Sequence, residues 1–530
     1  MRVIEEATSA GVAAAVVAHS RAVALWTLVS RGTGFVRVAA IAAALGPTFF
    51  GNLFQTAILV PYVLSQIFSG SLVPSYLTPH LVRAMDDGDE AEAGRLAGAF
   101  LKVLVTAFAT VALIGMAAAP GLAAVLTLGN ADPLIRERQI ALGIPLLVAL
   151  LPQVVFQGIA AVGIACQFAR RRFAFATAVP IIENLGVIGT VATAVIIYGS
   201  GHDVGEVTLG EVLLLGLGAS AASAAHAGAQ IWGATRAGFR FNLSSDWRAA
   251  GVMAAIRMAL ASSGTAGLAA LAWLIPVIAA GRVAGGSIAF QLGLLLFNLP
   301  LALAAQPVAT TQLPYLAGQA AVGGADVFNA SVSSSLRMVA FVMLPAGMLF
   351  LALPDNLAAA VAVGGMSDPG ATAMVADALA GLGIGLIAEG WAMVTTSASY
   401  ARLGAALPLQ AASLRLVISI IGVSFVLSQS GARPLLALGL AASASAVVTS
   451  AYLLWRSGAW SALGRADGYG RLAVNVLSAA AAVGPVGVLA AHIAPAGRIG
   501  EDALTTAGLL GLSGLIYVGV QLAVGGAGIR

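Results

Sequence analysis

Long apolar segments dominate the chain, and the short stretches between them hold most of its charges. A helix needs about 20 mostly apolar residues to cross the hydrocarbon core of a bilayer. Fourteen such segments can be read along the sequence. Their approximate bounds are 22–46, 50–79, 97–127, 138–166, 173–199, 207–233, 250–281, 285–312, 333–363, 371–400, 407–429, 433–456, 471–494 and 502–525. We therefore predict an all-α polytopic membrane protein with about fourteen transmembrane helices.

Composition argues against soluble enzymes and metalloproteins. Only 9% of the residues are charged and 59% are hydrophobic, whereas a soluble domain has about 25% charged residues. Cys166 is the one cysteine, and no two histidines have the i,i+4 spacing of a metal-binding helix. The sequence has no nucleotide-binding motif and no catalytic triad. We expect a transporter with no metal and no bound cofactor, and no interaction with nucleic acid.

The arginines are distributed asymmetrically between the loops. Loops after even-numbered segments are rich in arginine, namely Arg83, Arg95, Arg170, Arg171, Arg172, Arg236, Arg240, Arg248, Arg402, Arg456 and Arg465. Loops after odd-numbered segments hold fewer, namely Arg136, Arg138, Arg282, Arg433 and Arg498. Because positively charged loops remain in the cytoplasm, we predict a multi-pass protein of the bacterial inner membrane with both termini cytoplasmic.

The longest polar stretch between segments, 234–249, separates the first six segments from the others. This layout is typical of transporters built from two repeats. We predict four parts: a cytoplasmic N-terminal segment (1–21), an N-lobe (22–240), a C-lobe (241–460) and a C-terminal helix pair (461–530).

Two arginines, Arg31 and Arg37, lie inside the first segment. A charge at membrane depth costs about 2.5–3.5 kcal/mol and usually faces a water-filled cavity. The planar guanidinium can bind two phosphate oxygens at once. We predict that both arginines line a cavity and bind a phosphate-containing substrate. The alternative for Arg31 is a place near the cytoplasmic headgroups.

Other polar side chains also lie within apolar segments. The amides of Asn52, Gln55, Gln291 and Asn298 are predicted substrate ligands in a hydrated central space; their alternative is hydrogen bonding between neighbouring helices. Glu183 is a candidate for ion coupling, because intramembrane acids often bind protons or ions. For Glu389 we favour a structural ion pair with Arg415.

Several short motifs occur in the order and spacing of a known family. They are Ser30-Arg31-x-x-Gly34-Phe35-x-Arg37 followed by Pro61, Arg172-Phe173 followed by Pro180 and Asn184, Leu313-Pro314, Leu336-Arg337 with Leu344-Pro345, and Tyr400-Ala401-Arg402 with Pro408. With these motifs, most of the chain resembles the MurJ (MviN) family of lipid II flippases. That family is part of the superfamily of multidrug, oligosaccharidyl-lipid and polysaccharide (MOP) exporters.

The resemblance implies a fold of fourteen helices in two lobes around a cationic cavity. By alternating access, such a protein moves a polyprenyl-pyrophosphate-linked peptidoglycan precursor (lipid II or a relative) to the outer leaflet. Arg31 and Arg37 would bind the pyrophosphate, and the C-terminal helix pair would hold the lipid tail. We expect a monomer that is driven by the membrane potential or an ion gradient, and whose partners are membrane lipids and proteins of cell-wall synthesis.

The chain departs from the family pattern at several charged positions. Val38 replaces an acid after the second arginine, Asn52 replaces another, and Ser65-Gln66 replaces a basic pair. The family's Glu-Gly pair is not kept around Gly70, and its arginine in the eighth segment falls near Gly293 or Leu294. Two alternatives therefore stay open: a non-transporting scaffold or regulator of envelope synthesis, and a cation-coupled drug or polysaccharide exporter that uses Glu183.

Overall fold

The computed structural model describes residues 25–69, 73–243, 250–310, 325–402, 404–429, 431–464, 468–493 and 499–523. These residues form helices and no strands. The first described helix is Leu25–Leu45. The others are α2 (Phe49–Ala57), α3 (Val60–Ser69), η1 (Val73–Leu77), α4 (Thr78–Asp86), α5 (Glu90–Ala117), α6 (Ala119–Leu126), α7 (Pro133–Leu150), α8 (Gln153–Ala169), α9 (Phe173–Ala178), α10 (Pro180–Tyr198), α11 (Leu209–Arg236), α12 (Ala250–Ala280), α13 (Gly286–Pro300), η2 (Leu301–Ala305), α15 (Ala325–Ala352), α16 (Pro354–Val361), η3 (Gly364–Ser367), α17 (Pro369–Gly383), α18 (Leu386–Ala401), α19 (Ala406–Ser428), α20 (Pro434–Ser457), α21 (Ala459–Gly464), α22 (Gly468–Ala491) and α23 (Ile499–Ala523).

This architecture confirms the prediction of an all-α polytopic membrane protein. Among the described residues, eleven helices are long and apolar enough to cross a membrane, and α17 and α18 meet the same criteria only together, as a pair bent by 51°. The remaining two predicted segments, 50–79 and 250–281, coincide with the interrupted run α2–α3–η1–α4 and with α12. The count of fourteen membrane crossings therefore stays a prediction.

The polar breaks in the sequence supply the caps of the helices. Asp89 accepts a hydrogen bond from the Glu92 amide at the start of α5, and Asp132 accepts from two amides at the start of α7. Asp368 caps α17 in the same way. A side-chain oxygen at this position satisfies amides that have no partner within the helix. The helices therefore start at these aspartates, which lie between the predicted apolar segments, because their side chains cap the first turn.

Prolines mark several of the interruptions within the apolar segments. Pro61 follows the break between α2 and α3, Pro152 separates α7 from α8, and Pro300 precedes the π-helical turn η2. Proline lacks the amide hydrogen and clashes with the preceding turn, so it breaks the regular hydrogen bonding of a helix. Such irregular backbone at membrane depth is typical of walls that line a cavity.

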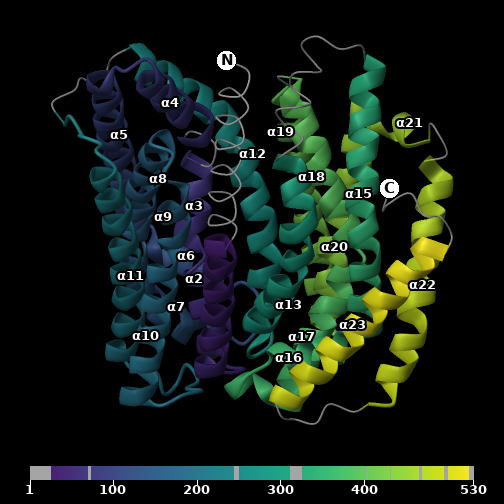
Figure 1. The fold of residues 1–530 in the computed structure, drawn as a ribbon. Helices are drawn as coiled ribbons and strands as arrows, with labels where there is room; N and C mark the ends of the chain where they lie inside the picture. Colours follow the sequence, from purple (N-terminus) through teal and green to yellow (C-terminus); the bar gives the residue numbers. More distant parts are fainter. Residues whose placement is uncertain are drawn as a thin grey trace.

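The helices form two groups that stand side by side (Figure 1). Helices up to α11 lie on one side, and we call them the first half. Helices from α13 onward lie on the other side, and we call them, together with α12, the second half. Helix α12 runs between the groups and packs against both α3 and α19, while α2 packs against α13. The pair α22–α23 packs on α15 and α16. The exact boundaries of the four predicted parts stay a prediction, and residues 1–21 lie outside the described residues.

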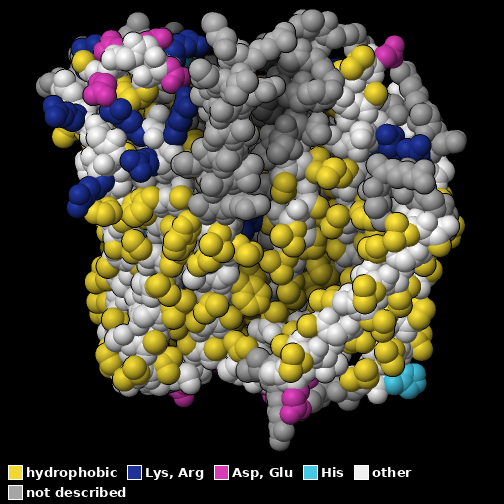
Figure 2. Space-filling view, viewed as in Figure 1, with side chains coloured by type: hydrophobic (Ala, Val, Ile, Leu, Met, Phe, Trp, Pro, Cys, Tyr) yellow, Lys and Arg dark blue, Asp and Glu magenta, His cyan; other side chains and the backbone are white. Residues whose placement is uncertain are grey.

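One end of the molecule is rich in arginine. Figure 2 shows Lys and Arg side chains gathered at the upper end of the first half, above a broad band of hydrophobic side chains. This is the end at which α8 finishes before Arg170-Arg171-Arg172 and α11 finishes at Arg236. We call it the arginine-rich end, and the other the opposite end. The separation of charge from an apolar band is the pattern expected of a membrane protein.

The linker that leaves α11 lies along α5 at the arginine-rich end. The Asn242 amide donates to the Gly94 carbonyl at 3.0 Å. A Cβ atom added at Gly94 would overlap the Arg240 carbonyl oxygen, and one at Gly98 would overlap the Asn242 carbonyl oxygen. The linker therefore fits against α5 because both positions are glycine.

The substitution Gly98→Ala should lower the melting temperature of the purified protein by several degrees, because overpacking a close contact costs about 1–3 kcal/mol. Gly121→Ala in α6 is a matched control, since a Cβ there meets no atom within 4 Å. Alanine also favours a helix over glycine, so Gly121→Ala should match or exceed the stability of the wild type. Equal melting temperatures for the two variants would contradict the close contact.

Candidate functional site

A cavity of about 890 Å³ lies in the first half, with α13 of the second half contributing to its wall. Most of its polar lining is uncharged. It is lined by Arg37, Val38, Ile41, Gln55, Ile58, Leu59, Tyr62, Ser65, Gln66, Val73, Thr78, Gln153, Gln157, Ala161, Ile164, Phe168, Glu183, Val187, Ala219 and Gln291. The lining extends to Phe168, two residues before Arg170 at the arginine-rich end. A cavity of this size that combines apolar walls with convergent polar side chains is typical of a ligand site.

Four of the residues singled out in the sequence line this cavity. They are Arg37, Gln55, Gln291 and the ion-coupling candidate Glu183. They come from four elements that are distant in sequence: the first helix, α2, α13 and α10. The structure therefore brings them together, while substrate binding by these residues stays a prediction.

Arg37 is placed to receive an anion from the cavity. Its Nε atom is buried and has no hydrogen-bond partner among the described residues. A buried polar group without a partner costs free energy unless a ligand or water satisfies it. The carboxylate of Glu183 faces the same cavity but is hydrogen-bonded to His226. The guanidinium of Arg37 thus keeps its hydrogen-bonding capacity for a ligand.

Arg31, in contrast, does not line the cavity. Its side chain is exposed and donates a hydrogen bond to Gln306 Oε1 at 2.8 Å. Gln306 belongs to the apolar helix 286–310, so the bond joins the first helix to the second half. This placement corrects the expectation that the two arginines face one cavity, and it gives Arg31 a bridging contact between the halves.

Asn52 and Asn298 also lie outside the cavity lining. Asn52 is buried, accepts a hydrogen bond from the Ser287 amide at 2.9 Å and donates to the Val283 carbonyl at 2.7 Å. Asn298 is exposed and donates to Leu294 of its own helix. For Asn52, the alternative reading of hydrogen bonding between helices is the one that the structure supports. Both placements correct the expectation of a shared substrate cavity.

The contacts of Asn52 join the two halves of the molecule. They join α2 of the first half to the turn between α12 and α13. The Gly285 amide adds a bond to the Thr48 carbonyl at 3.1 Å, and Gly285 has φ +73°, a conformation that side chains rarely adopt. We call this set of contacts between α2 and the α12–α13 turn the outer contact.

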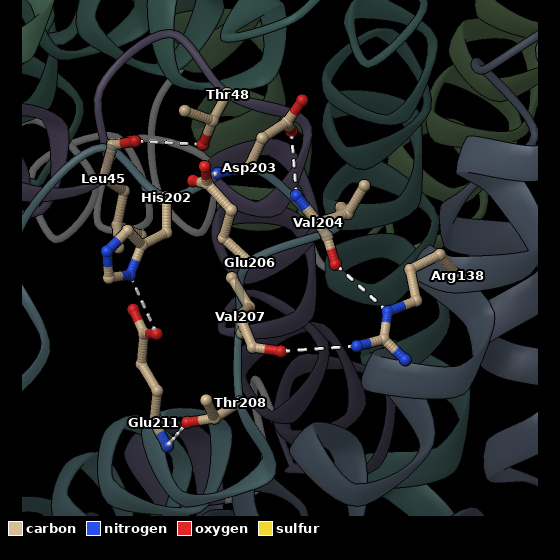
Figure 3. A network of polar contacts seen from close by, with 10 residues as sticks. All are labelled: Leu45, Thr48, Arg138, His202, Asp203, Val204, Glu206, Val207, Thr208 and Glu211. Atoms are coloured by element: carbon tan, nitrogen blue, oxygen red, sulfur yellow. Dashed lines mark hydrogen bonds and ion pairs between the residues drawn. The ribbon is translucent and has the colours of Figure 1, made fainter.

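A polar network supports the outer contact from the first half (Figure 3). Asp203 Oδ1 accepts hydrogen bonds from the amides of Phe49 and Val204. Arg138 donates to the Val204 carbonyl at 3.1 Å, and His202 contacts Glu211 at 3.2 Å. The loop before α11 is thereby fixed against the start of α2. This loop therefore helps to position the outer contact.

The predicted pair of Glu389 and Arg415 is confirmed. Arg415 Nη1 lies 2.8 Å from Glu389 Oε1, and both side chains are largely buried. The guanidinium also lies over the ring of Trp273, 4.7 Å from its centroid. This pair connects α18 with α19 within the second half, away from the cavity lining.

We expect Glu389→Leu to lower the unfolding free energy by about 3–5 kcal/mol, because it leaves the buried Arg415 guanidinium without its carboxylate. The double variant Glu389→Leu/Arg415→Met should recover most of the loss, since no unpaired charge remains. Stability can be measured by unfolding in detergent, and transport beside it. A double variant that is stable but inactive would show that the pair has a role in transport and is not only structural.

Sequence analysis missed several residues of the site. Tyr62 lines the cavity from α3 beside Ser65 and Gln66, which the sequence had marked as departures from the family pattern. His226 was also missed; it contacts Glu183 at 2.7 Å from a neighbouring helix. Tyr62 could have been found from its position three and four residues before Ser65 and Gln66, which places it on the same face of α3. No local pattern links His226 to a residue 43 positions earlier.

Comparisons with known proteins agree with this architecture. The family model for lipid II flippase MurJ matches residues 41–501. A probable lipid II flippase MurJ of Rhizobium meliloti (strain 1021) is 25% identical over 517 residues, which are 95% of this chain and 93% of the relative. A solved structure of lipid II flippase MurJ in an inward closed conformation has a TM-score of 0.73 at 14% identity and covers 96% of this chain and 99% of that one. An inward-facing multidrug resistance MATE family transporter of the MOP superfamily has a TM-score of 0.60 at 15% identity, covering 82% and 95%.

Proposed function

The chain belongs to the lipid II flippase MurJ family, and from this premise we propose that it moves a polyprenyl-pyrophosphate-linked peptidoglycan precursor, lipid II or a relative, from the inner to the outer leaflet. The observation that carries the proposal is Arg37, whose buried Nε has no partner among the described residues and which lines a cavity of about 890 Å³. A guanidinium in such a place suits a diphosphate, because charge-assisted hydrogen bonds are stronger than neutral ones.

The positive-inside rule gives the orientation. The arginine-rich end faces the cytoplasm, so both termini are cytoplasmic and the protein spans the bacterial inner membrane. The cavity then extends toward the cytoplasm, and the outer contact closes the periplasmic side. A precursor made in the cytoplasm can reach Arg37 only in this arrangement, and opening of the outer contact completes alternating access.

The uncharged lining supports the same substrate class. Glutamine, serine, threonine and tyrosine side chains of the cavity can hydrogen-bond hydroxyl and amide groups, as in the sugar and peptide of such a precursor. The C-terminal pair α22–α23 would hold the lipid tail. Translocation uses the membrane potential or an ion gradient, which supplies about 2.3 kcal/mol per charge per 100 mV. We further propose a monomer that contacts membrane lipids and the proteins of cell-wall synthesis.

Depletion of the protein in its host tests the proposal. Lipid-linked precursors are quantified on each face of the membrane, with wild-type protein and Arg37→Ala as the rescuing genes. We expect precursors to accumulate on the cytoplasmic face and wild type, but not Arg37→Ala, to restore their distribution. An unchanged distribution on depletion would contradict flipping. Rescue by Arg37→Ala would favour the non-transporting scaffold.

A further inference from the structure

Glu183 and His226 form a buried pair at the wall of the cavity. Glu183 lies on α10 and His226 on α11, with His226 Nδ1 at 2.7 Å from Glu183 Oε2. Their side chains are 20% and 14% exposed, respectively. Glu183 lines the cavity and its second oxygen, Oε1, has no hydrogen-bond partner among the described residues. A proton can therefore reach the carboxylate from the cavity.

The neighbours of His226 define the form of its imidazole. Gln230 Nε2 lies 3.3 Å from His226 Nε2 and donates to the Ala176 carbonyl at 3.0 Å. The Gln230 oxygen accepts from Gln167 Nε2 at 2.7 Å, which fixes the amide orientation. An amide nitrogen only donates, so His226 Nε2 accepts and Nδ1 carries the hydrogen directed at Glu183. In this arrangement the imidazole donates its Nδ1 hydrogen to Glu183 Oε2.

A single proton changes the net charge of the cavity lining. Among the described residues that line the cavity, Arg37 from the first helix and Glu183 from α10 are the charged ones. The side chains that face the cavity from α2, α3, α8 and α13 contribute the neutral amides Gln55, Gln66, Gln153, Gln157 and Gln291. Arg37 and Glu183 therefore sum to zero, and one added proton makes the sum +1. In a site partly shielded from water, one unit of charge changes anion affinity strongly.

We propose that Glu183 and His226 form a proton-binding site, and that proton occupancy of this pair controls the affinity of Arg37 for the anionic group of the substrate. The inference rests on the proposed function for the identity of that anion. The unprotonated carboxylate repels a diphosphate that approaches Arg37, and the protonated pair does not. His226 acts as a positioning residue, because it holds one carboxylate oxygen and leaves the other open to the cavity.

Binding of farnesyl diphosphate to the purified full-length protein in neutral-lipid nanodiscs tests this link. We expect wild type to bind the probe about tenfold more tightly at pH 6 than at pH 8. Glu183→Gln should bind it tightly at both values, since it removes the negative charge. His226→Gln should show a smaller difference, because the carboxylate loses its imidazole partner. The probe's own ionisation is common to all variants and cancels in the comparison.

Glu137→Gln is the matched control, since Glu137 is exposed near the start of α7 and lies outside the cavity lining. It should keep the pH dependence of the wild type. If Glu183→Gln also keeps that dependence, the inference is overturned.

A second measurement without ligand separates this inference from the proposed function. Infrared difference spectra between pH 6 and pH 8 should show a change in the carboxylate bands of the wild type that is missing in Glu183→Gln. No such change in the wild type would overturn the proton site. A change in these bands without farnesyl diphosphate binding at either pH would refute the anion site of the proposed function and, with it, the link to Arg37.

Discussion

The substitution Arg37→Ala should abolish translocation of the lipid-linked precursor while leaving the protein folded. Arg37 lines the cavity, and its buried Nε has no protein partner among the described residues, so alanine removes no structural hydrogen bond of that atom. A hydrogen bond to a charged group contributes about 1.5–3 kcal/mol. Loss of two such bonds to a diphosphate weakens binding by more than about a hundredfold. The measurement is precursor flipping by the purified protein in proteoliposomes.

Arg31→Ala is the comparison variant, because it removes an arginine of the same helix that lies outside the cavity lining. Arg31 is exposed and already bonded to Gln306 at 2.8 Å, so its loss removes one contact between the halves. We expect flipping to fall only severalfold, since water can replace this single exposed hydrogen bond. Equal losses for the two variants would show that Arg31 also binds the substrate during the cycle. Full activity of Arg37→Ala would exclude the cavity as the anion site.

The features of the fold that could be predicted from sequence are those that local chemistry determines. The length of an apolar segment determines whether it can cross the membrane as a helix. Asp89, Asp132 and Asp368 cap helices in the polar stretches between the predicted segments. Continuity of a helix was harder to predict. The segment 50–79 is apolar throughout most of its length, yet it is interrupted after Ala57 and again at η1, because proline and packing against a cavity break helices that hydrophobicity alone would extend.

The candidate site shows the limit of sequence reasoning more clearly. A polar residue in an apolar segment must find a partner, but the sequence does not say which one. Arg37 and Asn52 met the same criterion, and the structure gives the first a cavity and the second a set of backbone partners. The direction in which a side chain points relative to the cavity depends on how the helices pack, and only the three-dimensional structure shows this packing. The pairing of Glu183 with His226 depends on the contact between α10 and α11 in the same way.

Asn52→Leu should open the cavity at the outer contact, which the proposed orientation places on the periplasmic side. The wild-type amide bonds the Ser287 amide, the Val283 carbonyl and, at 3.4 Å, the Gly281 carbonyl. Leucine has a similar size but leaves these buried backbone groups without partners, which costs about 1–3 kcal/mol for each group. A loss of about 3 kcal/mol or more shifts the balance between closed and open states over a hundredfold. Transport should fall, because a cavity that stays open on one side cannot alternate.

The shift can be measured by labelling a cysteine at Gln291, which lines the cavity. In a Cys166→Ala background that removes the one native thiol, Gln291→Cys should react with a membrane-impermeant maleimide added outside intact cells at least tenfold faster when Asn52 is leucine. Asn298→Leu makes the same substitution at an exposed amide bonded only within its own helix, so it should leave the rate unchanged. Faster labelling from the cytoplasmic side alone would reverse the proposed orientation. Equal rates in both variants would mean that Asn52 does not hold the outer contact closed.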